Sequence, residues 1–183
     1  MATREDSLRR PVEDRLQRLA ATPQEIARAI QDQGDVVLSR RPAPHKWSAK
    51  EVVCHLRDIE ELCILRFHTM LVMDAPKVLV AGEPPQDPEA WGIGEGVPFP
   101  LDPDRWAGER QYQRNDAALA LGAFRRRRQE VLTLLRRLSP AQWRRGCLHP
   151  GLGQFTFGDW TASMAAHDDK HLGQLTRAMA GSP

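Results

Sequence analysis

The sequence has few cysteines and no long apolar run. Its three cysteines, Cys54, Cys63 and Cys147, are an odd number without paired CxxC spacing, so they indicate neither a disulfide framework nor a thiolate zinc site. We expect them to be reduced and buried. No apolar stretch approaches the ~20 residues that a membrane span needs, and residues 1–20 are charged throughout, unlike a signal peptide. We therefore expect a cytoplasmic protein that does not act at a membrane.

An excess of charge of one sign is also lacking. The 26 lysines and arginines are balanced by 24 carboxylates, which leaves a formal net charge of +2. Such a balance argues against a general nucleic-acid binder. The exception is the run of four arginines at 125–128, but successive helical residues point about 100° apart, and such a run is usually a solvated face. DNA binding through this run stays a minor alternative, and a steep fall of affinity with salt would be its signature.

Length and helical end signals indicate one helical domain. A chain of 183 residues is expected to bury roughly 70% of its unfolded surface in a single core, so we expect one domain over residues 1–183. Thr22 as N-cap with Pro23 at the first helical position predicts a helix that runs to about Leu38. Ser48, followed three residues later by a glutamate, forms a capping box that starts a second helix at about 49–72.

The second half of the chain predicts two further helices after a long connection. Residues 74–110 carry seven prolines and no helical period. Apolar residues at heptad-like spacing predict a third helix at about 111–138, and Thr156 starts a fourth that runs to about Met179 and stops at Gly181. The predicted fold is therefore an all-α four-helix bundle with a long crossover between helices 2 and 3, which allows those two helices to run parallel.

Histidines lie on the apolar faces of two of these helices. His55 is at the centre of the core face of the second helix, and His167 and His171 lie on the core face of the fourth. A lone histidine on an apolar face is more often a hydrogen-bonded core residue than a ligand, and HxxxH spacing alone is weak evidence. Three imidazoles on facing stripes carry more weight, because buried ring nitrogens without partners cost on the order of 1–3 kcal/mol each.

Shared metal coordination would remove that cost. Residues i and i+4 lie one above the other on a helix, so His167 and His171 are placed to bind one ion, and His55 from a neighbouring helix completes a facial triad. The remaining positions are left to water or substrate, as in catalytic rather than structural metal centres. A zinc-protease interpretation of the HxxxH helix fails, because Asp168 replaces the usual glutamate and residues 172–183 offer no third ligand.

These stretches together resemble the DinB-like family of metal-binding four-helix bundles. The similarity extends from about 18 to 181, so it implies a domain core over 18–181 and an N-terminal extension at 1–17. The family's three metal-binding histidines fall on His55, His167 and His171. The stretches that carry the resemblance are 46–58 with Glu60 and Arg66, Phe124 with Arg128, 138–143, and 167–172 with Gln174.

The resemblance implies an up-down-down-up bundle and a thiol-dependent chemistry. Family members with assigned activities resemble transferases in which the metal activates a low-molecular-weight thiol, and many other members have no known activity. The segment at 82–100 looks longer than the family pattern, so a particular substrate cannot be carried over. The leading hypothesis is a metal-dependent, thiol-dependent transferase acting on a small molecule. A small-molecule hydrolase and a non-catalytic metal-binding stress-response protein remain as alternatives.

Several polar residues are candidates for supporting roles around the metal. Glu51, Asp58 and Gln174 are placed to hold ring N–H groups, although ordinary surface or interhelical contacts are the more common role of such residues. Arg66 and Arg128 lie on core stripes, where each is expected to pair with a buried carboxylate or to receive a substrate carboxylate. We expect one divalent metal per chain, zinc or nickel foremost and iron or copper as alternatives. A homodimer is also expected.

Overall fold

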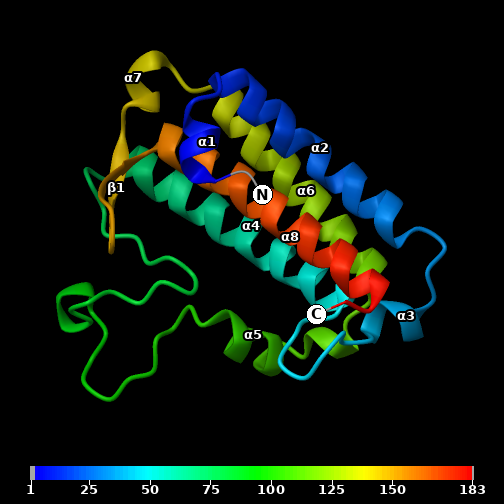
Figure 1. Cartoon of the computed structure of the whole chain (residues 1–183). Coiled ribbons are helices and arrows are strands. Elements are labelled where there is room, and N and C mark those ends of the chain that lie inside the picture. Colours follow the sequence, from blue (N-terminus) through cyan, green and yellow to red (C-terminus); the bar gives the residue numbers. More distant parts are fainter. Residues whose placement is uncertain (1–2, 183) are drawn as a thin grey trace.

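The computed structural model describes residues 3–182, and its centre is a bundle of four long helices (Figure 1). Helix α4 packs against α6 and α8, and α2 packs against the same two helices from the other side. The buried apolar side chains between them form two adjoining clusters. The bounds of the four helices are Val12–Ile30 for α2, Ala49–Val72 for α4, Ala117–Arg136 for α6 and Phe157–Ala180 for α8.

The expected first helix, from Thr22 to Leu38, was wrong at both ends. Helix α2 begins at Val12 and ends at Ile30, and the short helix α3 (Asp35–Ser39) follows separately. Thr22 does not cap a helix: it is fully buried, and its hydroxyl donates a 2.6 Å hydrogen bond to Asp168 on α8. Tertiary contacts with α8 therefore override the local start signal.

Pro23 consequently lies inside a helix, where proline normally leaves the carbonyl four residues earlier without a donor. That carbonyl belongs to Leu19, and it accepts a 2.8 Å hydrogen bond from Nη1 of Arg128 on α6. The lost backbone bond is thus replaced by a side-chain bond from the neighbouring helix. This substitution explains how α2 continues through Pro23.

The predicted starts of α4 and α8 are confirmed. Ser48 and Glu51 form both bonds of a capping box before α4. Thr156 and Asp159 do the same before α8, which ends at Gly181 in the left-handed conformation. Helix α6 starts later than predicted, because residues 112–114 form a separate turn and Asp116 caps the helix.

A two-stranded antiparallel sheet departs from the all-α prediction. Strands β1 (Gly146–His149) and β2 (Gly153–Thr156) form a hairpin directly before α8. The remaining elements are short helices and 3-10 turns: α1 (Arg4–Leu8), α5 (Pro103–Glu109), α7 (Pro140–Trp143), η1 (Glu89–Trp91) and η2 (Tyr112–Arg114). None of the helices within residues 3–182 has the length and apolar character that a membrane crossing requires.

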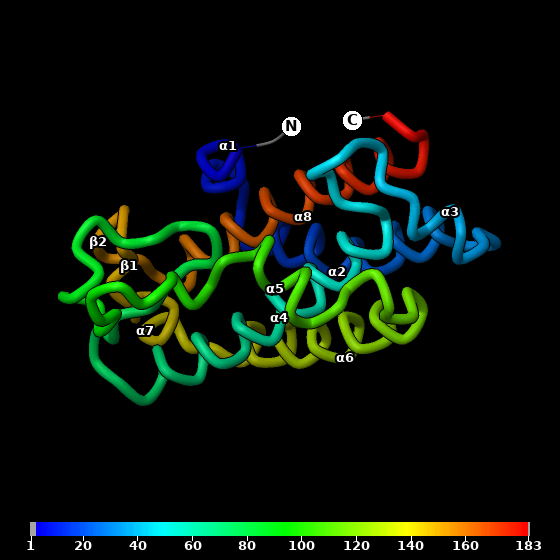
Figure 2. The backbone as a smooth tube through the Cα atoms, turned by 90° about the horizontal axis from the view of Figure 1, so that it is seen from below, coloured from blue at the N-terminus to red at the C-terminus, as the bar shows by residue number. Residues whose placement is uncertain are grey.

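The long connection between α4 and α6 lies beside the hairpin (Figure 2). Its first part pairs with β1, because Val78 N–H donates to the Leu148 carbonyl (3.0 Å) and Leu148 N–H donates to the Pro76 carbonyl (2.8 Å). Further along, the Gly82 N–H donates to the Leu101 carbonyl at 2.9 Å. The connection therefore folds back on itself, and its residues 80–83 reach the cavities described below.

Candidate metal centre

The structure brings His55, His167 and His171 together between α4 and α8. Nε2 of His55 lies 3.2 Å from Nε2 of His167, and one ring nitrogen from each of the three residues lies within 4.8 Å of the others. His55 and His171 are buried, and His167 is partly exposed. In residues 3–182 this is the one group of three or more histidines, cysteines or carboxylates close enough to share an ion.

The arrangement fits a divalent metal. Zinc–nitrogen bonds of about 2.0–2.1 Å at tetrahedral angles separate two ligand nitrogens by about 3.3 Å, close to the His55–His167 distance. His171 shares a 2.8 Å hydrogen bond between Nδ1 and Oε1 of Gln174. Because an amide oxygen only accepts, that bond places the proton of neutral His171 on Nδ1 and leaves the Nε2 lone pair for a ligand bond. Gln174 therefore bonds the ring of His171, and its support of a bound metal stays a prediction.

Burial keeps all three imidazoles neutral, which is the form that binds metal. Desolvation, followed by the charge of His171, lowers the pKa of His55 well below its usual range. The same two causes act in that order on the pKa of His167. Desolvation and the nearby Lys170 lower the pKa of His171 to about 4. At neutral pH each ring therefore keeps one nitrogen without a proton, and that nitrogen is available for a ligand bond.

These pKa values predict that the metal-free protein loses stability as pH falls. In the unfolded chain His171 takes up a proton near pH 6.5, whereas in the folded chain it does so only near pH 4. The unfolded state thus binds more protons between these values, which costs the fold about 2 kcal/mol between pH 6.5 and 4.5 from this residue alone. Urea unfolding of the chelator-treated parent and of His171→Leu at both pH values measures this contribution of His171 to the free energy of unfolding. Equal pH dependence in the two proteins would contradict it.

The two carboxylates expected near His55 bond to other groups. Glu51 accepts from the Ser48 backbone and pairs with Arg41, which lowers its pKa against the opposing effect of burial. Asp58 accepts hydrogen bonds from Arg57, Arg110 and Tyr112 at 2.7–2.8 Å. Both residues therefore form bonds that connect α4 to neighbouring segments of the chain. Nδ1 of His55 is buried and has no hydrogen-bond partner among the described residues.

Arg128 is committed to a buried ionic network beside the histidines. Its Nε and Nη2 each donate to a Glu60 carboxylate oxygen at 2.8 Å. Its Nη1 and Nη2 donate to Asp168 at 2.6 and 3.1 Å, and Asp168 also accepts from Thr22. Of its two expected roles, Arg128 therefore takes the pairing with buried carboxylates. Asp168 directly follows His167 in the chain, so the network holds the part of α8 that carries the ligands.

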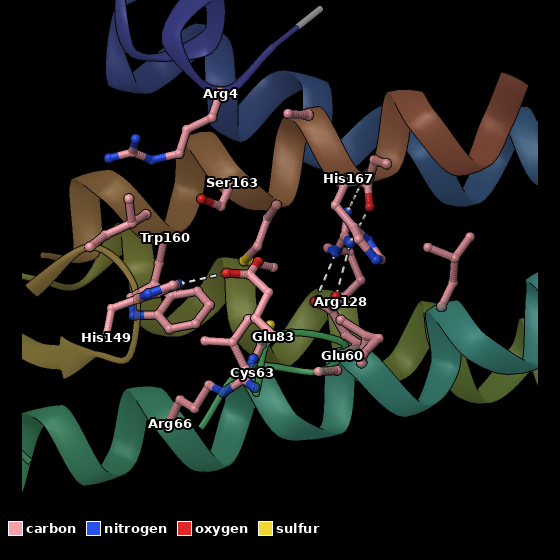
Figure 3. Close-up of a pocket in the computed structure, with 18 residues that line it drawn as sticks. Arg4, Glu60, Cys63, Arg66, Glu83, Arg128, His149, Trp160, Ser163 and His167 are labelled. Carbon is pink, nitrogen blue, oxygen red and sulfur yellow. Dashed lines mark hydrogen bonds and ion pairs between the residues drawn. The ribbon is translucent and has the colours of Figure 1, made fainter. Parts of the chain in front are cut away.

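Two cavities meet at His167. The inner one, of about 280 Å³, is lined chiefly by residues of α4 and α8, and most of its exposed wall surface is apolar (Figure 3). The outer one, of about 720 Å³, is lined by all three histidines and by a cationic rim of Lys46, Lys170 and Arg177, beside the carboxylates Glu83 and Asp104. Ile59, Ala81, Glu83 and His167 line both cavities.

The cysteines are reduced and buried, as predicted. Burial raises the pKa of Cys54 to about 11 and that of Cys63 to about 12, and it also raises the pKa of Cys147. Each side chain is therefore a neutral thiol at physiological pH, which is a poor nucleophile. Any thiol chemistry at the histidine site would need a thiol supplied from outside the chain.

Comparisons with known proteins agree with this geometry. A solved structure of YfiT from Bacillus subtilis, described as a probable metal-dependent hydrolase with an unusual four-helix bundle topology, matches with a TM-score of 0.74. The two sequences are 20% identical, and the match covers 97% of this chain and 88% of that chain, so it shows a shared fold. No curated protein sequence gives a significant match. The family model described as the DinB superfamily matches residues 18–175, and the chain therefore belongs to the DinB superfamily, as its sequence had indicated.

Proposed function

We propose that this protein uses one divalent metal ion, held by His55, His167 and His171, to hydrolyse a small organic molecule bound in the inner cavity. The observation that carries the proposal is a group of three neutral histidines whose ring nitrogens lie within 4.8 Å of one another, beside the point at which two cavities meet at His167. The likeness to YfiT, described as a probable metal-dependent hydrolase, supports the same chemistry.

An open coordination position supports catalysis over a purely structural role. Structural zinc sites are closed by four protein ligands, whereas catalytic sites keep three and leave one position free. Within residues 3–182 the candidate site has three ligands, and cavities adjoin it. When bound by these three histidines, a divalent ion would supply a Lewis acid that lowers the pKa of a nucleophile and polarises a carbonyl. We propose zinc or nickel first, with iron or copper as alternatives, because imidazole suits all four.

The chain's own residues orient the ligands and keep the cavity dry. Gln174 determines which nitrogen of His171 faces the site, and the Trp47 ring lies 4.8 Å from the His55 ring, centre to centre. Ile59, Met164 and Trp160 give the inner cavity an apolar wall that excludes bulk water from a bound substrate. These residues position groups and shape the site.

The proposed site depends on the directions of the helices, for which we infer an up-down-down-up bundle. Arg57 near the start of α4 bonds Asn115 before α6, and Leu71 and Leu138 near the other ends line one groove. These contacts support a parallel α4 and α6 with residues 74–110 as the crossover. An antiparallel α4 and α8 then places His55, early in α4, beside His171, late in α8.

Thiol transfer is a second candidate, favoured by the cationic rim of the outer cavity. Lys46, Lys170 and Arg177 surround the approach to the histidines, where an anionic low-molecular-weight thiol would be attracted. The same open position would then activate a thiol in place of water. A homodimer and a cytoplasmic location remain predictions alongside either activity.

The test compares hydrolysis with thiol consumption by the same metal-loaded protein. We expect hydrolysis of 4-nitrophenyl esters or 4-nitroanilides that stops on chelation, returns with metal, and falls at least about a hundredfold in His167→Ala, since a metal-activated nucleophile supplies most of such a rate. Consumption of glutathione with 1-chloro-2,4-dinitrobenzene, without ester or amide hydrolysis, would favour thiol transfer. Bound metal without either turnover would overturn both activities and leave the non-catalytic metal-binding role.

A further inference from the structure

Arg66 is a buried cation that the histidine site does not use. Its residue is 7% exposed, its Nη2 donates a 2.6 Å hydrogen bond to the Leu79 carbonyl, and its guanidinium lies 4.8 Å from the centre of the Trp160 ring. Among the described residues no carboxylate comes within 4.0 Å of it. Buried arginines are rarely left without an acid partner, because taking the charge out of water is costly unless an opposite charge compensates it.

Arg66 lines the inner cavity and has no carboxylate partner, and this combination distinguishes it from the other buried arginines among the described residues. Arg128 lines the cavity too but is saturated by Glu60 and Asp168. Arg15 lacks a carboxylate within 4.0 Å, but it bonds the Gly158 carbonyl and the Thr161 hydroxyl and is not in the cavity wall. Arg66 is thus the buried cation that faces a cavity with its charge unpaired.

The position of Arg66 relative to the histidines sets the shape of a ligand. Figure 3 shows Arg66 with Trp160 and His149 at one end of the cavity and His167 at the other. Along α4, Arg66 follows His55 by eleven residues, which corresponds to about 16 Å of helix. The wall between the two ends is mainly apolar. A ligand that touches both ends must therefore be elongated, with an apolar middle.

The other charged groups around the cavity are largely neutralised. Arg4 also lines the cavity, but it pairs at 3.1 Å with Asp159, which is not part of the cavity wall. Glu83 lies 3.6 Å from Nε2 of His149, and its side chain is 59% exposed on the long connection. The carboxylate of Glu83 is the group that would repel an anion at this end, and its exposed position leaves it free to turn toward solvent.

We propose that Arg66 binds the carboxylate of an elongated, otherwise apolar substrate whose reactive ester or amide lies at the histidine triad. A planar guanidinium recognises a planar carboxylate through paired N–H donors, and the Trp160 ring against its face holds it in one plane. The claim that a reactive ester or amide lies at the triad rests on the proposed function, whereas the claim of a carboxylate site depends on Arg66 alone. The substrate class is a medium-chain acyl compound with a terminal carboxylate.

Binding of octanoate and of octanol, a neutral molecule of equal chain length, tests the anion site by calorimetry. We expect the parent to bind octanoate at least about tenfold more tightly than octanol, since a charge-assisted hydrogen bond from arginine to a carboxylate is roughly twice as strong as a bond to a neutral hydroxyl. Arg66→Met, which keeps the aliphatic stem, should lose that preference and still bind octanol. Arg66→Lys should restore part of it, and Glu83→Gln should strengthen octanoate binding by removing the facing carboxylate.

Controls separate this proposal from the metal chemistry. Arg126→Met removes the same charge from an exposed site and should leave octanoate affinity unchanged. A carboxylate can also bind a metal directly, so each titration is repeated on chelator-treated protein, where the effect of Arg66→Met must persist. Equal affinity of the parent for octanoate and octanol, or unchanged octanoate binding in a folded Arg66→Met, would overturn the proposal even if hydrolysis is confirmed. Loss of hydrolysis with the anion preference intact would overturn only the proposed function.

Discussion

The double substitution His167→Ala/His171→Ala is expected to remove the bound metal and to lower its affinity by at least about a thousandfold. Two of three ligands are lost, and each nitrogen–metal bond contributes several kcal/mol to binding energies that total about 10–16 kcal/mol in zinc peptides. The untagged parent should hold about one ion per chain after dialysis. Elemental analysis and competition with a chromogenic chelator measure the stoichiometry and the affinity.

Matched variants make this result specific. His68→Ala removes an exposed histidine of α4 and should leave the metal content unchanged. Gln174→Ala removes the bond that orients His171 and should weaken binding by about 10–100-fold, the usual effect of losing such a supporting group. A parent protein that stays metal-free after reconstitution with zinc, nickel, iron and copper would refute the central hypothesis. Circular dichroism checks that the substituted proteins remain helical.

The histidine site was visible in the sequence because it depends on regular helices. The spacing of His167 and His171 and the centring of His55 on an apolar face require only that both segments be helical and buried. The capping boxes at Ser48 and Thr156 position those segments along the chain, and both are present in the structure. What the three residues bind stays a prediction, since proximity alone does not identify a ligand.

Other features were hidden because tertiary contacts decide them. Thr22 and Pro23 look locally like a helix start, but bonds from Arg128 and to Asp168 let the helix pass through them. The hairpin at 146–156 has strands of four residues, too short for an alternating pattern to stand out. Apart from Arg57, which neighbours Asp58 on α4, the partners of Glu51 and Asp58 lie outside the four long helices, so their positions could not be derived from helical geometry.

The buried network around Arg128 predicts the second large effect. Arg128→Met should destabilise the fold by about 3–5 kcal/mol, the usual cost of leaving buried carboxylates without their counter-ion. Glu60 and Asp168 are 1% exposed, so water cannot replace the lost guanidinium. The Leu19 carbonyl, which Pro23 leaves without a backbone donor, loses its partner as well. Urea unfolding of the parent and the variant at pH 8 measures the loss.

The neighbouring arginine provides the control. Arg127 pairs with Glu61 at 2.7 Å, but the Glu61 side chain is 51% exposed, so Arg127→Met should cost no more than about 1 kcal/mol. Equal losses of stability in the two variants would show that the buried network contributes no more to folding than an exposed ion pair. Replacing all three charged groups, as in Glu60→Met/Arg128→Met/Asp168→Leu, should recover most of the stability, because an apolar core of similar volume needs no counter-ion.

The dependence of this loss on pH separates a charge effect from a packing effect. Burial already raises the pKa of Glu60, and removing the guanidinium raises it further because the attraction that favoured the ionised form is gone. A folded-state pKa above the unfolded value makes the fold less stable as pH rises and more stable as pH falls. The difference between Arg128→Met and the parent should therefore shrink from pH 8 to pH 5, whereas a difference caused by lost packing would stay constant. Metal retention by the variant at pH 8 then shows how far α8 depends on this network to hold His167, the residue next to Asp168, in place.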